Sequence, residues 1–186
     1  MVARHLIHKN KEHHGRTPLK ILAGTAMALF TLYLFLSIIS YNQLDPSLNR
    51  ATGDDAANWG GYFGAIVADL GLQSLGLASL LLVAIPLTWA VKIMQGSHIT
   101  YMWLRFTLLL ASLVTVSGLL ALLDPPLSWS ITSGFGGAIG AVQQEFFYKL
   151  YKNPLFVSAN LFMSLVMVSL AFGMSWTEWR NVGHHL

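Results

Sequence analysis

The sequence predicts an all-α integral membrane protein whose four transmembrane helices form two hairpins, with short interfacial helices in the outer loops. Hydrophobic residues make up 54% of the chain and charged residues only 10%, whereas soluble domains carry about 25% charged residues. Apolar runs of the ~20 residues needed to cross a bilayer occur four times, separated by polar turns. The chain has no cysteine, which excludes a disulfide framework and a cysteine metal site.

The first predicted crossing covers residues 21–41 and follows a basic cytoplasmic tail, residues 1–20. A helix of this length spans the ~30 Å hydrocarbon layer of a bilayer. A cleaved signal peptide is the competing interpretation, but the apolar run is too long and no Ala-x-Ala site follows it. His5 and His8 lie in the tail without a carboxylate or thiolate at a suitable spacing, so we favour a solvated tail touching anionic lipid over a metal site.

The second apolar segment, residues 59–94, is too long for a single crossing. We expect residues 60–73 to lie at or beyond the far membrane face and residues 74–94 to cross, with a kink at Pro86. The remaining predicted segments are the crossings 103–123 and 155–176, an interfacial amphipathic helix within 142–152, and a C-terminal cytoplasmic tail or start of a linker, 177–186.

One unit of sequence occurs twice: an apolar run ends at Asp-Pro, and a polar loop then leads to Gly-Gly-x-x-Gly-Ala and the next apolar run. The two turns begin at Asp45-Pro46 and Asp124-Pro125. The pattern is that of a parallel internal repeat, although convergence on the same turn and helix-start chemistry would also produce it. Aspartate before proline is favoured in turns, so we favour turn roles over a catalytic carboxylate pair.

Small residues recur every four positions after the first turn, as Gly60, Gly64 and Ala68 in one row and Gly61, Ala65 and Asp69 in another. This spacing lets helix backbones approach closely, although glycine and alanine are also common in membrane helices generally. Asp69 either caps or bonds a neighbouring helix, or is solvated at the membrane interface. The candidate packing and interaction residues are Gly60, Gly61, Gly64, Ala65, Ala68, Asp69, Gln73, Gly76, Gly136, Gly137 and Gly140, and the turn motifs are Asp45, Pro46, Asp124 and Pro125.

The basic residues predict that both termini are cytoplasmic, because positive charge gathers on the inner side of a membrane. The predicted inner segments hold Arg4, Lys9, Lys11, Arg16, Lys20, Lys92, Arg105 and Arg180. The predicted outer segments hold only Arg50, Lys149 and Lys152.

Motifs for catalysis are missing from the sequence. It has no Gly-x-x-x-x-Gly-Lys-[Ser/Thr], no His-Glu-x-x-His and no Gly-x-Ser-x-Gly. No charged residue lies in the middle of a predicted crossing, where pumps and proton-coupled carriers usually need one. We therefore predict no catalytic residues, no cofactor and no metal, and that the chain by itself is not an enzyme.

The stretch between the first two crossings resembles the N-terminal four-helix membrane domain of the FtsK/SpoIIIE family of septal DNA translocases. The resemblance is carried by Asp45-Pro46-Ser47, Asn58, Gly61, Gly64-Ala65, Ala68-Asp69-Leu70, Gln73 and Gly76. Three features depart from the family pattern. Leu48 stands where the family often has tryptophan, Asn42-Gln43 replaces a more proline-rich turn, and the second outer segment is longer than the resemblance leads us to expect.

The resemblance implies a membrane-anchoring and interaction module for bacterial cell division and chromosome segregation, placed in the inner (cell) membrane at the septum. Its implied partners are the lipid bilayer, further copies of itself and division-site membrane proteins. The implied contact with DNA is only through an ATPase motor that would lie downstream of this sequence. A small four-helix transporter or channel subunit is the alternative function, because transporters are often built from repeated hairpins.

Overall fold

The computed structural model describes residues 16–48, 50, 55–97, 99–126, 131 and 133–173. The histidines His5 and His8, most of the N-terminal tail and the predicted C-terminal tail lie outside the described residues. Within the described part the regular structure is helical, with one isolated β-bridge between Ser47 and Arg50 and no strand. The all-α fold is therefore confirmed.

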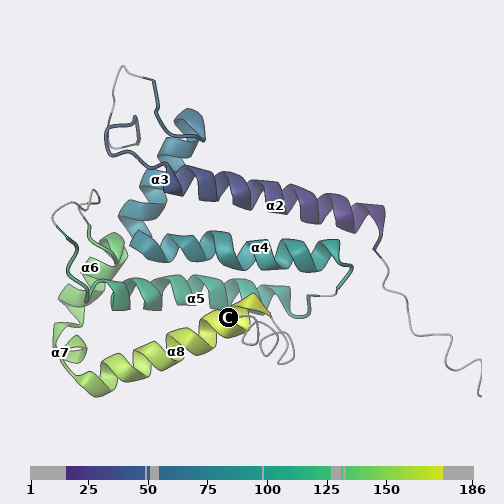
Figure 1. Ribbon diagram of the computed structural model, residues 1–186. Coiled ribbons are helices and arrows are strands. Elements are labelled where there is room, and N and C mark those ends of the chain that lie inside the picture. The colour runs from purple at the N-terminus through teal and green to yellow at the C-terminus, as the bar shows by residue number, and fades with distance from the viewer. Residues whose placement is uncertain are drawn as a thin grey trace, which may run out of the picture.

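Four stretches of helix are long and apolar enough to cross a membrane, which confirms the four predicted transmembrane helices. The helices that run across the molecule are α2 (Pro18–Ile39), α4 (Leu81–Met94), α5 (Met102–Leu120) and α8 (Pro154–Phe172). Figure 1 shows them side by side in that order. The most extensive contacts join α2 to α4 and α5 to α8, so the molecule consists of two hairpins, which meet through α3, η2 and α4.

Local sequence chemistry explains where two of these helices begin. The Thr17 hydroxyl caps α2 by accepting a hydrogen bond from the Lys20 backbone N–H, and the Asn153 side chain caps α8 at the Leu155 N–H. A proline occupies the first position of both helices, where its missing N–H and fixed φ angle cost nothing.

The second crossing is broken into three pieces: α3 (Gly61–Leu75), the 3₁₀-helix η2 (Gly76–Leu80) and α4. In Figure 1, α3 lies across the ends of the long helices and the chain changes direction at η2. Pro86, where we expected a kink, lies inside α4, and the change of direction seen in Figure 1 comes before it, at η2. Together η2 and α4 are about 31 Å long, which is enough to cross the hydrocarbon layer without α3.

The buried core lies where α4, α5 and α8 meet, around Ile85 and Leu109. Near its edge the indole N–H of Trp89 donates to the carbonyl oxygen of Ala171 at 2.8 Å. Two cations then bind the last carbonyls of α8: Lys92 Nζ donates to Gly173 and Arg105 Nη1 to Leu170. Positive charge at a helix C-terminus is favourable, so this end of α8 is fixed to both α4 and α5.

Candidate interaction site at the loop end

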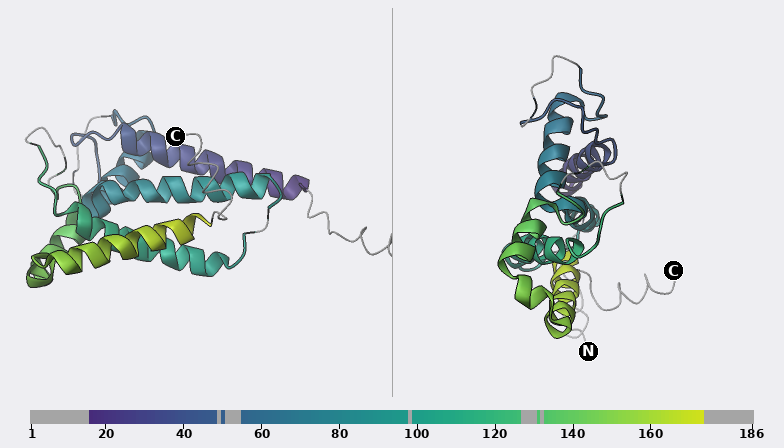
Figure 2. Two further views of the ribbon diagram at one scale, coloured as in Figure 1. Left: turned by 60° about the horizontal axis from the view of Figure 1, so that its bottom comes forward. Right: turned by 90° about the vertical axis from the view of Figure 1, so that its left-hand side faces the viewer.

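Three helices lie across one end of the long helices: α3, α6 (Gly137–Phe146) and α7 (Tyr148–Tyr151). Figure 2, right, looks onto this end and shows α3 and α6 following one another across it. We call this region, with the loops that enter these three helices, the loop end; the α4–α5 turn lies at the opposite end. Every residue predicted from the sequence to take part in packing or interaction lies at the loop end.

Asp45 closes the loop between α2 and α3. Its carboxylate accepts hydrogen bonds from the backbone N–H groups of Ala57 at 2.8 Å and Asn58 at 3.0 Å, and the side chain is only 7% exposed. The neighbouring Pro46 is buried, whereas Asp124 and Pro125 in the second loop are exposed. The two Asp-Pro turns therefore share a sequence but not an environment, and the structure does not bring the two carboxylates together as a buried pair.

Asn58 joins this loop to the end of α2. Its buried carboxamide donates to the carbonyl oxygens of Ser37 at 2.8 Å and Ser40 at 3.3 Å, which lack helical partners at the end of α2. Its Oδ1 accepts from the Gly60 N–H at 2.9 Å, and the Ser40 hydroxyl accepts from the Trp59 N–H. Asn58 thus caps the end of α2 and bonds the residue that precedes α3.

Gly60 and Gly64 lie where α3 crosses α2. A Cβ atom added to Gly64 would stand 2.7 Å from Asn58 Oδ1 and 2.8 Å from the hydroxyl oxygen of Ser37, and one added to Gly60 would also collide with that hydroxyl. The Tyr33 hydroxyl donates to the Gly60 carbonyl oxygen at 3.0 Å. Neither position leaves room for a side chain, because the Ser37 hydroxyl and the Asn58 side chain already fill that space.

The second hairpin repeats this arrangement. Gly136 and Gly140 lie against Ser117 of α5, and an added Cβ at either position would collide with the Ser117 carbonyl oxygen. The backbone angles also repeat: φ is +64° at both Gly61 and Gly137, the first residues of α3 and α6. Glycine adopts such angles at little cost. In each Gly-Gly pair the first glycine makes the close contact, and the second begins the helix with a positive φ angle.

The two repeated units meet at Gly76 and Gly137. A Cβ added to Gly137 would lie 2.5 Å from the Gly76 nitrogen, and one added to Gly76 would collide with the Phe135 carbonyl oxygen. That same oxygen accepts a hydrogen bond from the Leu77 N–H at 2.9 Å. The loop before α6 therefore joins the start of η2 by direct backbone contacts.

Four polar side chains connect the two loops across this junction. The Tyr41 hydroxyl donates to the Asp69 carboxylate at 3.0 Å, Gln73 Nε2 lies 3.4 Å from the Tyr41 oxygen, and the Ser133 hydroxyl donates to Gln73 Oε1 at 2.8 Å. Burial, together with the hydrogen bond to Asp69, raises the pKa of Tyr41 to about 12. Asp69 of α3 therefore bonds the segment that follows α2.

The other candidates differ in their surroundings. Ala65 and Ala68 are buried on α3, whereas a Cβ added to Gly61 would meet nothing within 4 Å. The sequence analysis missed Ser37 and Ser117, the residues on which the two glycine rows pack. Each lies in an apolar run about two helical turns before an Asp-Pro pair, and that shared position is the signal that would have found them.

The chemistry available at the loop end is that of packing and hydrogen bonding. Among the residues that the structure describes, no three His, Asp or Glu side chains gather where they could hold a metal ion. The two acidic side chains with the most bonds, Asp45 and Asp69, are engaged by backbone N–H groups and a tyrosine hydroxyl. The fold and this end thus define a multi-pass membrane domain built around two copies of one helix-crossing motif.

The chain belongs to the family described as the 4TM region of DNA translocase FtsK/SpoIIIE, which matches residues 17–182. A protein named DNA translocase FtsK from Rhizobium meliloti (strain 1021) is 31% identical over 119 residues, covering 64% of this chain and 14% of that protein. A protein of the same name from Caulobacter vibrioides is 33% identical over 121 residues, covering 63% of this chain and 15% of that protein. A third protein of this name, from Azospirillum brasilense, is 29% identical over 164 residues, covering 85% of this chain and 26% of that protein.

The chain therefore spans only 14–26% of the length of these relatives. No solved structure matches it. The family match confirms the resemblance identified from the first loop, and it shows that the chain is a membrane domain of this family.

Proposed function

We propose that the chain is the membrane-anchoring and interaction module of a bacterial cell-division DNA translocase. The observation that carries this proposal is that the family match, residues 17–182, includes all four membrane-spanning helices. ATP-driven movement of DNA belongs, in this proposal, to parts of the translocase outside the matched region. The role of the present chain is then to hold those parts at the membrane and to bind partners there.

The distribution of charge supports an orientation with both termini in the cytoplasm. Among the described basic residues, Arg16 precedes α2, Lys20 lies in the first turn of α2, and Lys92 and Arg105 flank the α4–α5 turn. The loop end has three basic residues: Arg50, Lys149 and Lys152.

Fusions of a periplasm-active reporter test this orientation. A reporter fused at Ser133 should be active and one fused at Ser97 inactive, and activity at Leu186 would contradict the proposed orientation.

The proposed partner-binding surface is the exposed side of the α3 start. Trp59 is 71% exposed and Tyr62 62% exposed, and neither is used in the buried contacts described above. Aromatic side chains of this kind dominate the binding energy of many protein interfaces. A comparable pair, Tyr101 and Trp103, is exposed at the opposite end of the molecule.

These two pairs allow a matched test of the interaction role. We expect Trp59→Ala with Tyr62→Ala to abolish enrichment of a fluorescently tagged chain at the division site and to weaken its crosslinking to itself or to division proteins. The control, Tyr101→Ala with Trp103→Ala, should keep both. Equal septal enrichment of the two double variants would contradict this surface.

A further inference from the structure

A groove opens between α5, α6, α7 and α8 at the loop end and encloses about 390 Å³. This volume falls within the roughly 300–1,000 Å³ of typical small-molecule sites. Its lining combines apolar and polar side chains, among them Phe147, Phe156, Met163, Gln143, Tyr151 and Asn160. The groove is therefore amphipathic, although it lies beside membrane-spanning helices.

The polar side chains in the groove bond to one another but leave capacity for a ligand. The Tyr151 hydroxyl donates to Gln143 Oε1 at 3.1 Å, and Asn160 Nδ2 donates to the Tyr151 oxygen at 3.2 Å. A carboxamide has two N–H groups, and the second one of Asn160 has no partner among the residues that the structure describes. A polar group that faces hydrocarbon is costly unless it is hydrogen-bonded, and the ester carbonyl of a lipid can accept such a bond.

Two cations neighbour the lining residues of the groove in sequence, without lining it themselves. Lys149 and Lys152 are exposed and flank the lining residues Leu150 and Tyr151, and Lys152 Nζ stands 4.3 Å from the centre of the Tyr148 ring. The single acidic residue of α6 and α7 is Glu145, so the net charge here is positive. Basic side chains beside a pocket between membrane helices favour anionic lipid head groups.

We propose that this groove binds one anionic phospholipid from the leaflet at the loop end. The phosphate lies with Lys149 and Lys152, the ester region bonds Asn160, and an acyl chain follows Phe156 and Met163. This lipid site requires only that the chain is embedded in a membrane. Its test is therefore independent of the proposed role at the septum.

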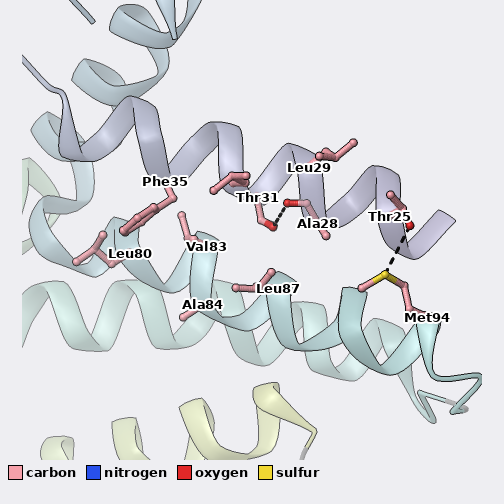
Figure 3. A pocket seen from close by; sticks show the side chains of 11 residues that line it. Thr25, Ala28, Leu29, Thr31, Phe35, Leu80, Val83, Ala84, Leu87 and Met94 are labelled. Carbon is pink, nitrogen blue, oxygen red and sulfur yellow. Dashed lines mark hydrogen bonds between the residues drawn. The ribbon is translucent and has the colours of Figure 1, made fainter. Parts of the chain in front are cut away.

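The structure offers an internal comparison in a larger groove of about 600 Å³ between α2 and α4 (Figure 3). Its lining contains no charged side chain. Its hydroxyl groups are already engaged: Thr31 donates to the Ala28 carbonyl oxygen at 2.9 Å and Thr25 to the Met94 sulfur at 3.6 Å. This groove can accommodate the acyl chain of any lipid, but its lining provides no group that would select one head group over another.

The test is native mass spectrometry of the purified full chain with equal amounts of phosphatidylglycerol and phosphatidylcholine. We expect one phosphatidylglycerol to be retained in preference to phosphatidylcholine. Lys149→Gln with Lys152→Gln should lower phosphatidylglycerol retention by roughly tenfold or more, because each lysine contributes roughly fivefold near an anionic surface. Asn160→Leu should lower retention of both lipids.

There are two control variants. Arg50→Gln removes a loop-end cation of the other hairpin, in the loop between α2 and α3, and Thr25→Val alters the uncharged groove between α2 and α4. Both should bind phosphatidylglycerol like the unaltered chain, and circular dichroism should show the same helical content in every variant. The proposal is overturned if the unaltered chain retains both lipids equally, if Arg50→Gln weakens binding as much as the double lysine variant, or if only a lipid-free dimer is found.

Discussion

The Cβ position of Gly137 lies 2.5 Å from the backbone nitrogen of Gly76, so the starts of α6 and η2 touch without an intervening side chain. These glycines belong to different hairpins, and their contact joins the two repeated units of the chain. The same junction carries the bend of the second crossing, because η2 begins at Gly76. The geometry of the whole loop end therefore depends on two positions at which only hydrogen fits.

Gly137→Ala should destabilise the protein more than Gly134→Ala. Both glycines have positive φ angles, +64° and +71°, so alanine at either costs about 1–2 kcal/mol of backbone strain. Only Gly137 faces backbone atoms, since a Cβ at Gly134 would meet nothing within 4 Å. We expect unfolding in detergent to show a loss of roughly 3 kcal/mol or more for Gly137→Ala. Equal losses would mean that the junction relaxes freely.

The two glycine rows on α3 should respond differently to a large side chain. Leucine at Gly64 would have to displace Asn58 and Ser37, whereas the Cβ of leucine at Gly61 would point into open space. We expect Gly64→Leu to abolish self-association or septal function without loss of membrane insertion. Gly61→Leu should show only the milder effect of a strained backbone. Crosslinking measures self-association of both variants, and a larger loss in Gly61→Leu than in Gly64→Leu would contradict this account.

Asp45→Ala should loosen the first loop. The substitution leaves the N–H groups of Ala57 and Asn58 without their acceptors, at a cost of about 1–3 kcal/mol for each one that stays buried. The matched control is Asp124→Ala, because that aspartate is exposed. We expect faster proteolysis or hydrogen exchange between α2 and α3 in Asp45→Ala alone. Identical exchange in both variants would contradict a closing role for Asp45.

Tyr41 should give a late step in the ultraviolet titration of the tyrosines. Its pKa is raised from 10.0 to about 12, so the fold favours the neutral hydroxyl. The stability that this group contributes is complete below about pH 10 and is lost as the pH rises through about 12. Tyr41→Phe should remove one late-titrating tyrosine from the absorbance curve. An unchanged curve above pH 11 would contradict the burial of Tyr41 and its bond to Asp69.

Much of the architecture followed from the sequence, because apolar length and glycine spacing are local properties. The four crossings, the pairing into hairpins and the family were all predicted from such features. The contact between Gly76 and Gly137 was not, because it depends on how two distant segments meet. The different surroundings of Asp45 and Asp124 were also hidden, since both stand in the same Asp-Pro context. Ser37 and Ser117 were overlooked because single serines are ordinary in membrane helices.

The most direct test of the proposed function is the position of the fluorescently tagged chain in dividing cells that lack its full-length relative. The chain should gather at the division site without any motor segment, because membrane anchoring and partner contacts are the functions that we assign to it. The purified chain should neither hydrolyse ATP nor pass solutes in liposomes. Uniform membrane fluorescence throughout the division cycle would contradict the proposed function.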